Sequence, residues 1–352
     1  MKTLMIMAGG TGGHVYPAVA VADYLIAQGW KIVWLCTEGG MENSLIASKP
    51  YHKAIIQMKG VRGKGLLRLA YLPWQLLKAF AQSYKAIKQT QPNVLLGMGG
   101  FAAFPGGIVG RFLGKSLVIH EQNSIAGLTN KVLAKIATRV LVAFPEALAK
   151  AELVGNPVRV DITAVAVPEM RFAKRTGVMK LLVVGGSLGA QALNEIVPLA
   201  LNKIPAERRP QVIHQAGVKQ FELLKANYKN AQVNADCRAF IDDMAHEYAT
   251  ADLVICRAGA MTIAELSAAG VASILVPFPF AVDDHQTTNA AYLVATNAAI
   301  LIQQRDLQAE QLATILQNLS REKCLEMAIK ARSLGLPLAT KTVADICAGV
   351  AK

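Results

Sequence analysis

The chain has 352 residues, 53% of them hydrophobic and 17% charged, and its 37 basic and 24 acidic side chains give a formal net charge of +13. This length predicts two domains that each bury a core, and the composition is too apolar for a disordered chain. No apolar run reaches the ~18 residues that span a bilayer, and glycines follow the first strand too early for a signal peptide, so we expect a cytoplasmic location. The five cysteines are widely spaced, and they indicate neither disulfides nor a zinc site.

Short apolar runs alternate with helical stretches along the chain. The runs predict strands at residues 3–7, 31–35, 94–96, 117–120 and 140–143, and again at 181–184, 212–214, 253–256, 274–276 and 299–302. Helical patterns lie between them, for example at residues 17–27, 190–201 and 262–269. Runs without polar alternation are typical of parallel strands that are covered on both faces. The sequence therefore predicts an α/β fold with doubly wound parallel sheets.

A glycine-rich turn follows the first strand and recurs half a chain later. The two turns are Gly9-Gly10-Thr11-Gly12-Gly13-His14 and Gly185-Gly186-Ser187-Leu188-Gly189-Ala190. Their first glycines are 176 residues apart, which predicts two Rossmann-like domains, at residues 1–159 and 160–336, with a boundary at a Gly-Asn-Pro turn. Each turn opens a helix whose first N–H groups can hold a phosphate, although a tight turn without a ligand is the alternative. The spacing lacks the Gly-x-Gly-x-x-Gly fingerprint, which argues against a dehydrogenase.

Two candidate functional residues lie at the predicted carboxyl edge of the first sheet, where open α/β sheets bind ligands. His14 lies where the first glycine turn meets its helix, and imidazole suits proton transfer near neutral pH. Its alternative role is that of a polar residue at a helix start. Glu121 belongs to a run of four polar residues, His120 to Asn123, that ends the strand at 117–120.

Three segments of the second half suit a nucleotide sugar. Ser187 adds a hydroxyl to the second glycine turn, where a helix N-terminus can stabilise a diphosphate. Glu265, near the start of the helix after the strand at 253–256, can accept two vicinal ribose hydroxyls, or can simply complement the helix dipole. The cluster 283–289 offers amides for sugar hydroxyls, or a capped helix start.

The basic charge lies almost entirely in the first half. Residues 1–160 contain 18 Lys and Arg against 6 Asp and Glu, and no acidic residue occurs between Glu42 and Glu121. Within that stretch, residues 59–88 interleave basic with apolar and aromatic side chains, which suits an anionic membrane surface. The alternative is a helix whose apolar residues pack on the sheet. The residues predicted to face the membrane are Arg68, Tyr71, Trp74, Lys78 and Phe80.

Seven motifs in order resemble those of the MurG family of peptidoglycan N-acetylglucosaminyltransferases. They are Gly-Gly-Thr-Gly-Gly-His at 9–14, Gly-Met-Gly-Gly at 97–100, His-Glu-Gln-Asn at 120–123, Gly-Asn-Pro-Val-Arg at 155–159, Gly-Gly-Ser-Leu-Gly-Ala at 185–190, Phe-Ile-Asp-Asp-Met at 240–244 and Arg-Ala-Gly-Ala-Met-Thr at 257–262. The resemblance covers nearly the whole chain. It implies the GT-B fold, with two Rossmann-like domains facing across a cleft, and a C-terminal helix at about 337–352 that packs back on the first domain.

The same resemblance implies an activity. The expected enzyme is an inverting hexosyltransferase that moves GlcNAc from UDP-GlcNAc to the C4 hydroxyl of MurNAc in lipid I, and so forms the β-1,4 linkage of lipid II. His14 is the implied general base, and Glu121 is a second candidate or an orienter. The implied donor contacts are Thr11, Gly12, Gly13, Asn123, Arg159, Ser187, Ile241, Ala260, Met261, Thr262, Ile263, Ala264, Glu265 and Gln286. No metal or other cofactor is expected.

Two positions depart from the family pattern. Phe101 stands where some members have Tyr, and His285 replaces the first of two glutamines, so that only Gln286 carries over. The expected partners are UDP-GlcNAc, lipid I, the anionic cytoplasmic face of the bacterial inner membrane and further cell-wall and division proteins, with no nucleic acid. The main alternative is a UDP-GlcNAc 2-epimerase of the same fold. A basic nucleic-acid-binding module is a second alternative, but it leaves both glycine turns without a role.

Overall fold

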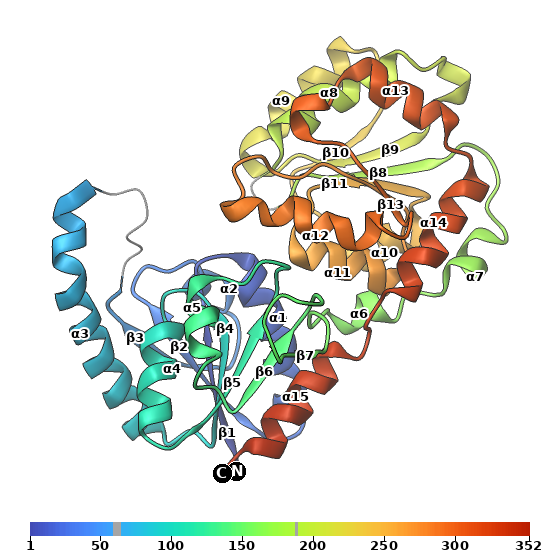
Figure 1. Cartoon of the computed structure of the whole chain (residues 1–352). Coiled ribbons are helices and arrows are strands. Elements are labelled where there is room, and N and C mark those ends of the chain that lie inside the picture. The colour runs from blue at the N-terminus through green and yellow to red at the C-terminus, as the bar shows by residue number, and fades with distance from the viewer. Residues whose placement is uncertain (59–64, 187–188) are drawn as a thin grey trace. The chain divides into compact units, whose positions relative to one another are not determined.

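The computed structural model describes residues 1–58, 65–186 and 189–352, with the backbone alone described for residues 65–71. The chain divides into two compact units (Figure 1). Unit 1 comprises Met1–Arg159 together with Pro337–Lys352, and unit 2 comprises Val160–Leu336. Each unit is built on its own parallel sheet.

Unit 1 contains, among its described residues, a seven-stranded parallel sheet in the order β3-β2-β1-β4-β5-β6-β7. Its strands are β1 (Thr3–Ala8), β2 (Lys31–Thr37), β3 (His52–Ile56), β4 (Val94–Gly99), β5 (Ser116–Glu121), β6 (Arg139–Val142) and β7 (Glu152–Leu153). The chain order reverses between β1 and β4, so the carboxyl ends of these two neighbours form a switch point where such sheets bind ligands.

Helices cover both faces of this sheet. They are α1 (Gly12–Ile26), α2 (Glu42–Leu45), α3 (Gly65–Thr90), α4 (Ala103–Phe112), α5 (Leu128–Leu133) and α15 (Ala339–Val350). One apolar cluster joins α1 and α15 to the central strands, and a second joins α3, α4 and α5 to the other face. Alternate residues of the strands supply the two clusters, because successive side chains of a strand point to opposite faces.

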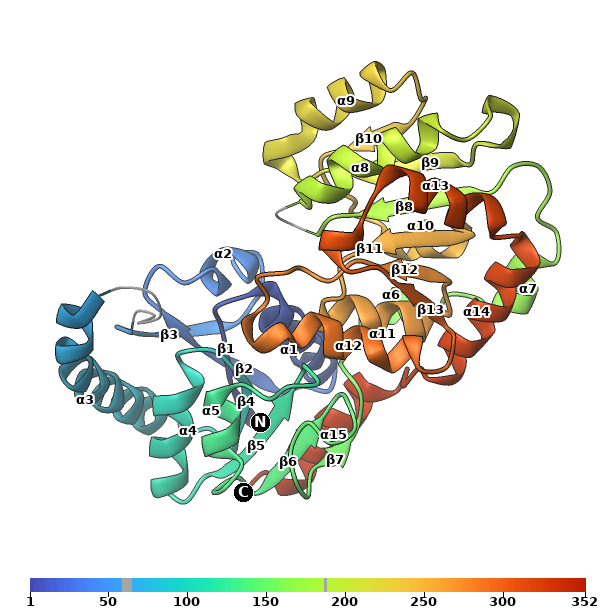
Figure 2. The same ribbon diagram turned by 45° about the horizontal axis from the view of Figure 1, so that its top comes forward.

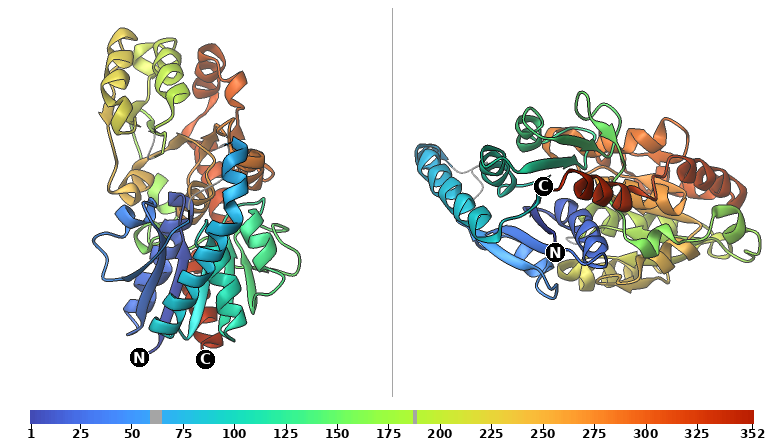
Figure 3. Two further views of the ribbon diagram at one scale, coloured as in Figure 1. Left: turned by 90° about the vertical axis from the view of Figure 1, so that its left-hand side faces the viewer. Right: turned by 90° about the horizontal axis from the view of Figure 1, so that it is seen from below.

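The C-terminal helix belongs to unit 1. Val343, Ala344 and Cys347 of α15 are fully buried in the cluster that contains α1. At the same end of the unit, the backbone N–H of Lys352 donates to the Asn93 carbonyl over 3.1 Å, and Asn93 Nδ2 donates to the Lys352 carbonyl over 2.7 Å. The N–H of Thr3 donates to Asn93 Oδ1, so both chain ends are held at one edge of the unit 1 sheet (Figure 3).

Unit 2 contains a six-stranded parallel sheet in the order β10-β9-β8-β11-β12-β13 over its described residues (Figure 2). The strands are β8 (Lys180–Val184), β9 (Gln211–Gln215), β10 (Asp236–Arg238), β11 (Leu253–Cys256), β12 (Ser273–Leu275) and β13 (Ala299–Leu301). The helices are α6 (Val160–Thr163), α7 (Pro168–Phe172), α8 (Gln191–Asn202), α9 (Phe221–Asn230), α10 (Met244–Thr250), α11 (Ala260–Ala269), α12 (His285–Val294), α13 (Ala309–Asn318) and α14 (Arg321–Ser333). Short 3-10 turns lie at Ala206–Arg208, Val218–Gln220, Val282–Asp284 and Gln304–Asp306.

The predicted α/β fold with doubly wound parallel sheets is confirmed, and each of the ten predicted strands overlaps an observed one. Three further strands, β3, β7 and β10, escaped the prediction. They lie at sheet edges, where one flank is not covered, so their sequences lack the continuous apolar run of a central strand. The first helix begins at Gly12 rather than at Pro17, which lies inside α1.

Candidate functional site

The sheet order of unit 1 brings three of the predicted motifs to one edge. The first glycine turn follows β1, the glycines at 97–100 end β4, and the polar run at 120–123 ends β5, and these three strands are neighbours. Parallel strands end at the same edge of their sheet, so residues that are far apart in the sequence meet there.

His14 is held by the turn that precedes it. Its Nδ1 lies 2.9 Å from the carbonyl oxygen of Gly9. A carbonyl can only accept, so Nδ1 carries the proton and Nε2 is left as the basic nitrogen. Among the described residues none hydrogen-bonds to Nε2. The ring is half-buried, and a Cβ on Gly99 would lie 3.1 Å from Nε2, so a bare glycine backbone borders the basic nitrogen.

Glu121 is a buried carboxylate with several donors. It is 2% exposed and accepts from the backbone N–H of Asn123 and of Gly127, each over 3.0 Å, and from Asn130 Nδ2 over 2.9 Å. Asn123 Nδ2 also lies 3.4 Å from the same carboxylate. A carboxylate occupied in this way orders the loop 123–127. Of the two roles considered for Glu121, the geometry favours the orienter over the general base.

His120 and Gln122, which flank Glu121, are buried and interlocked. His120 Nε2 donates to the Gly155 carbonyl over 2.8 Å, and its Nδ1 accepts from Gln122 Nε2 over 3.0 Å. Burial lowers the pKa of His120 to about 4, so the ring is neutral at physiological pH. Asn156 Nδ2 donates to the Gln122 carbonyl. Much of the polar run therefore ties β5 to the segment 155–159, and half-buried Asn123 is its outermost member.

The remaining predicted residues of unit 1 lie on its surface. Thr11 is exposed at the N-cap position of α1, and Gly12 and Gly13 form the first turn of that helix. Arg159 is exposed and is the last residue before unit 2. Phe101 is 41% exposed just after β4.

The second glycine turn approaches a neighbouring strand closely. Gly189 has φ +78°, and a Cβ there would lie 2.1 Å from the Ala216 carbonyl oxygen beyond β9. Gln215 Nε2 donates to the Gly186 carbonyl over 3.0 Å, which fixes the turn from the side. Only glycine fits at 189, because it tolerates both the positive φ and the contact. Ser187, the predicted diphosphate contact, lies outside the described residues.

The predicted ribose acid is oriented by a residue that sequence reasoning missed. Glu265 is half-buried on α11, and Tyr248 Oη donates to its Oε2 over 3.1 Å. Ala260 and Ile263, on the same helix, are buried, so their side chains face the core and their contribution to a ligand is limited to the backbone. Met261, Thr262 and Ala264 are half-buried.

Two further positions of unit 2 have defined geometry. Ile241 is 6% exposed, so it too can present only backbone groups. Gln286 Oε1 accepts from the N–H of Phe278 over 2.9 Å, so the amide nitrogen is the group that Gln286 can offer as a donor to a ligand. Arg257 holds the same loop by donating to the carbonyls of Val276 and Pro277, each over 3.1 Å, a role for which its sequence offered no signal.

The predicted membrane residues divide into two groups on α3. Trp74 is 64% exposed and Lys78 is exposed, and Leu77 beside them is 62% exposed. Phe80 instead is half-buried and packs against Phe104 of α4, with ring centroids 6.0 Å apart. The side chains of Arg68 and Tyr71 lie outside the described residues. Of the helices in the described part of the chain, none is long and apolar enough to cross a membrane.

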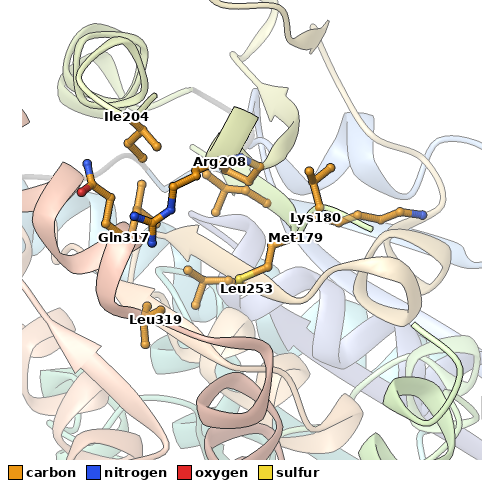
Figure 4. Close-up of a pocket in the computed structure, with 11 residues that line it drawn as sticks. Met179, Lys180, Ile204, Arg208, Leu253, Gln317 and Leu319 are labelled. Atoms are coloured by element: carbon orange, nitrogen blue, oxygen red, sulfur yellow. The ribbon is translucent and has the colours of Figure 1, made fainter. Parts of the chain in front are cut away.

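A cavity of about 240 Å³ lies in unit 2 at the amino ends of the strands, opposite the edge where the glycine turn follows β8 (Figure 4). Its lining includes Met179, Leu181 and Leu253 at the amino ends of β8 and β11, with Ile204 and Leu319 beside them. The glycine turn that follows β8 is at the other end of that strand, so this cavity is separate from the predicted donor residues. In the described ranges no group of three His, Cys, Asp or Glu is placed to hold a metal ion.

Comparison with known proteins covers both units. Residues 4–142 match the glycosyltransferase family 28 N-terminal domain, and residues 180–346 match the C-terminal domain of that family. The crystal structure of Acinetobacter baumannii MurG is 41% identical, covers 99% of this chain and 100% of its own, and superposes with a TM-score of 0.88. The chain belongs to the MurG family.

Curated members of the MurG family are closer in sequence. The Burkholderia thailandensis and Dechloromonas aromatica proteins are 55% and 54% identical, and they cover 99% and 100% of this chain and 96% and 99% of their own lengths. Both are named UDP-N-acetylglucosamine--N-acetylmuramyl-(pentapeptide) pyrophosphoryl-undecaprenol N-acetylglucosamine transferase. The calicheamicin glycosyltransferase CalG4 shares 15% identity at a TM-score of 0.68, so its likeness to the MurG family member described here concerns the fold alone.

Proposed function

We propose that this chain transfers GlcNAc from UDP-GlcNAc to the C4 hydroxyl of MurNAc in lipid I, forming lipid II for peptidoglycan synthesis. The observation that carries the proposal is the 55% identity, over essentially the full length of both chains, to transferases named for that donor and that acceptor. The seven motifs and the arrangement around His14 supply the chemistry.

On the acceptor side, His14 is the proposed general base. Its Nε2 takes the proton of the C4 hydroxyl as the C4 oxygen attacks the anomeric carbon of GlcNAc and the bond to UDP breaks. One displacement of this kind inverts the anomeric centre and gives the β-1,4 linkage. The Gly9 carbonyl keeps the Nδ1 proton in place throughout, so the ring presents the correct nitrogen before the substrate arrives. Glu121 orders the loop that carries Asn123.

On the donor side, helix N-termini and backbone N–H groups stabilise the negative charge that develops on departing UDP. The glycine turn before α8, with the Ser187 hydroxyl, and the start of α11 are the proposed positions. Glu265, oriented by Tyr248, holds the ribose, and Ile241 offers backbone groups to uracil. The sugar is bound by the amide nitrogen of Gln286 and by the side chain of Asn123. The diphosphate of the donor is bound by helix dipoles, backbone N–H groups and a hydroxyl, and we propose no metal or other cofactor.

The enzyme is proposed to act at the cytoplasmic face of the bacterial inner membrane as a peripheral protein. Exposed Trp74, Leu77 and Lys78 lie together on α3, within the stretch that has no acidic residue. Aromatic and aliphatic side chains enter the headgroup region, and lysines are attracted to anionic lipid. Further cell-wall and division proteins are proposed as partners, and nucleic acid is not.

The test is incubation with labelled UDP-GlcNAc and a soluble lipid I analogue. Label is expected to appear on the analogue with β stereochemistry, and UDP to appear in equal amount. Isomerisation of UDP-GlcNAc without any acceptor would instead indicate the 2-epimerase. Salt-sensitive DNA or RNA binding without any turnover would indicate the nucleic-acid-binding alternative.

A further inference from the structure

A buried carboxylate lies beneath the first glycine turn. Glu42, at the start of α2, is 0% exposed. Its Oε1 accepts from the backbone N–H and the hydroxyl of Thr37, each over 2.7 Å, and its Oε2 lies 3.4 Å from the backbone nitrogen of Gly10. These donors are neutral. A charged carboxylate is costly to bury, so its position against the turn calls for an explanation.

One peptide group links this carboxylate to His14. The N–H of the Gly9–Gly10 peptide points to Glu42 Oε2, and the carbonyl of the same peptide accepts from His14 Nδ1 over 2.9 Å. The contact between Glu42 and the turn is intimate, because a Cβ on Gly9 would lie 2.9 Å from the Glu42 carboxyl carbon. Glu42 and His14 are 28 residues apart in the sequence, with β2 between them.

The turn is also closed from the opposite side. A Cβ on Gly100 would lie 2.4 Å from the Gly9 carbonyl oxygen, and a Cβ on Gly99 would lie 3.1 Å from His14 Nε2. Both glycines have positive φ, +87° and +106° respectively. The Gly9–Gly10 peptide is therefore held between the Glu42 carboxylate and the two glycines at the end of β4, so it cannot rotate without displacing one of them.

A negative charge at the N–H end of a peptide strengthens the hydrogen bond that its carbonyl accepts, because linked hydrogen bonds polarise one another. A stronger bond at the Gly9 carbonyl favours the His14 tautomer with the proton on Nδ1. It also stabilises the positive charge that the ring acquires once Nε2 takes a proton. In a Ser-His-Asp triad the carboxylate does this in direct contact with the imidazole. Here a peptide group lies between them.

We propose that Glu42 is a positioning residue for the transfer reaction, which acts through the Gly9–Gly10 peptide to fix the tautomer of His14 and to stabilise the imidazolium formed during transfer. The inference rests on the proposed function of His14 as the base. The competing explanation is that Glu42 only stabilises the turn after β2, through its two short bonds to Thr37. The experiment must separate these two roles.

Glu42→Gln in the full chain makes that separation. The amide oxygen can keep both Thr37 bonds, while the amide nitrogen then faces the Gly10 N–H, where two donors oppose each other, and the charge is gone. Glu38→Gln is the matched control, because Glu38 is exposed in the same loop after β2. The expected result is a kcat about 10- to 100-fold lower for Glu42→Gln, comparable with the loss when a group that orients a metal-bound histidine is removed. KM for UDP-GlcNAc is expected to stay within about twofold, and Glu38→Gln is expected to leave both constants unchanged.

Two readouts then exclude a purely structural role. In a His14→Ala background, Glu42→Gln is expected to cost little further rate, since residues that act through one another are not additive. In the ¹⁵N-histidine spectrum, the His14 signal (identified by its loss in His14→Ala) is expected to shift toward the Nε2–H tautomer in Glu42→Gln. An equal loss of rate with and without His14, or an unchanged tautomer, would overturn the proposal. A wild-type enzyme that transfers no GlcNAc would contradict the proposed function instead, while the spectrum still tests the link.

Discussion

Replacing Gly100 by alanine tests how tightly the first glycine turn packs against the glycines at the end of β4. The added Cβ would lie 2.4 Å from the Gly9 carbonyl oxygen and 2.8 Å from its carbon, so backbone must move. The positive φ of +87° costs an alanine about 1–2 kcal/mol, and overpacking typically adds about 1–3 kcal/mol. We therefore expect Gly100→Ala to lower the free energy of unfolding of unit 1 by about 2–5 kcal/mol.

Gly114→Ala is the matched control. Gly114 also has positive φ, +73°, but its Cβ would meet nothing within 4 Å, so only the backbone cost of about 1–2 kcal/mol is expected there. Trp30, Trp34 and Trp74, which are the three tryptophans of the chain, all belong to unit 1. Urea unfolding followed by tryptophan fluorescence therefore reports this unit alone. Equal losses of stability in the two variants would refute the close contact between Gly100 and Gly9.

Three other expectations follow from the described contacts. Tyr248→Phe removes the donor to Glu265 and is expected to raise KM for UDP-GlcNAc a few-fold, about 1 kcal/mol, with kcat nearly unchanged; an unchanged KM would separate Glu265 from the ribose. Trp74→Ser is expected to weaken sedimentation with anionic liposomes without loss of stability, whereas Phe80→Ser, which removes a ring packed on α4, is expected to destabilise the protein, and equal effects would contradict that division. Burial lowers the pKa of His120 from 6.5 to about 4, so this ring binds a proton more readily in the unfolded chain. The His120 contribution to unit 1 stability is therefore full above about pH 6.5, and it falls toward pH 4 by up to about 1.4 kcal/mol per pH unit. Urea titrations at two pH values check this, and His120→Asn is expected to show a shallower pH dependence.

The architecture could be predicted because each central strand is recognisable in the sequence as a continuous apolar run. Runs such as 181–184 and 253–256 are buried on both faces, so each is apolar throughout, and the glycine turns after β1 and β8 mark where ligands approach. The edge strands β3 and β10 are partly exposed and mix charged with apolar residues, and loops have a similar composition. Pro17 gave a false helix start, since it lies in the interior of α1.

The site was harder to predict where residues act through others. His14 lies on α1 and Glu265 on α11, and both helices follow glycine-containing turns that sequence reasoning can recognise. Glu42, however, reaches the first turn from α2, and Tyr248 reaches Glu265 from α10, and no local pattern connects the members of either pair. The polar run at 120–123 correctly predicted the carboxyl edge of the sheet. Which of its side chains are buried depends on partners such as Asn130 and Gly155, and these meet the run only in the folded chain.

The role of His14 is tested most directly by comparing wild-type protein with His14→Ala in transfer from labelled UDP-GlcNAc to a lipid I analogue. UDP binding is measured by calorimetry on both proteins. Loss of the general base is expected to lower the transfer rate by about 10²- to 10⁴-fold while UDP affinity stays within about twofold. Near-normal transfer by His14→Ala would contradict the central claim that Nε2 of this ring receives the acceptor's proton.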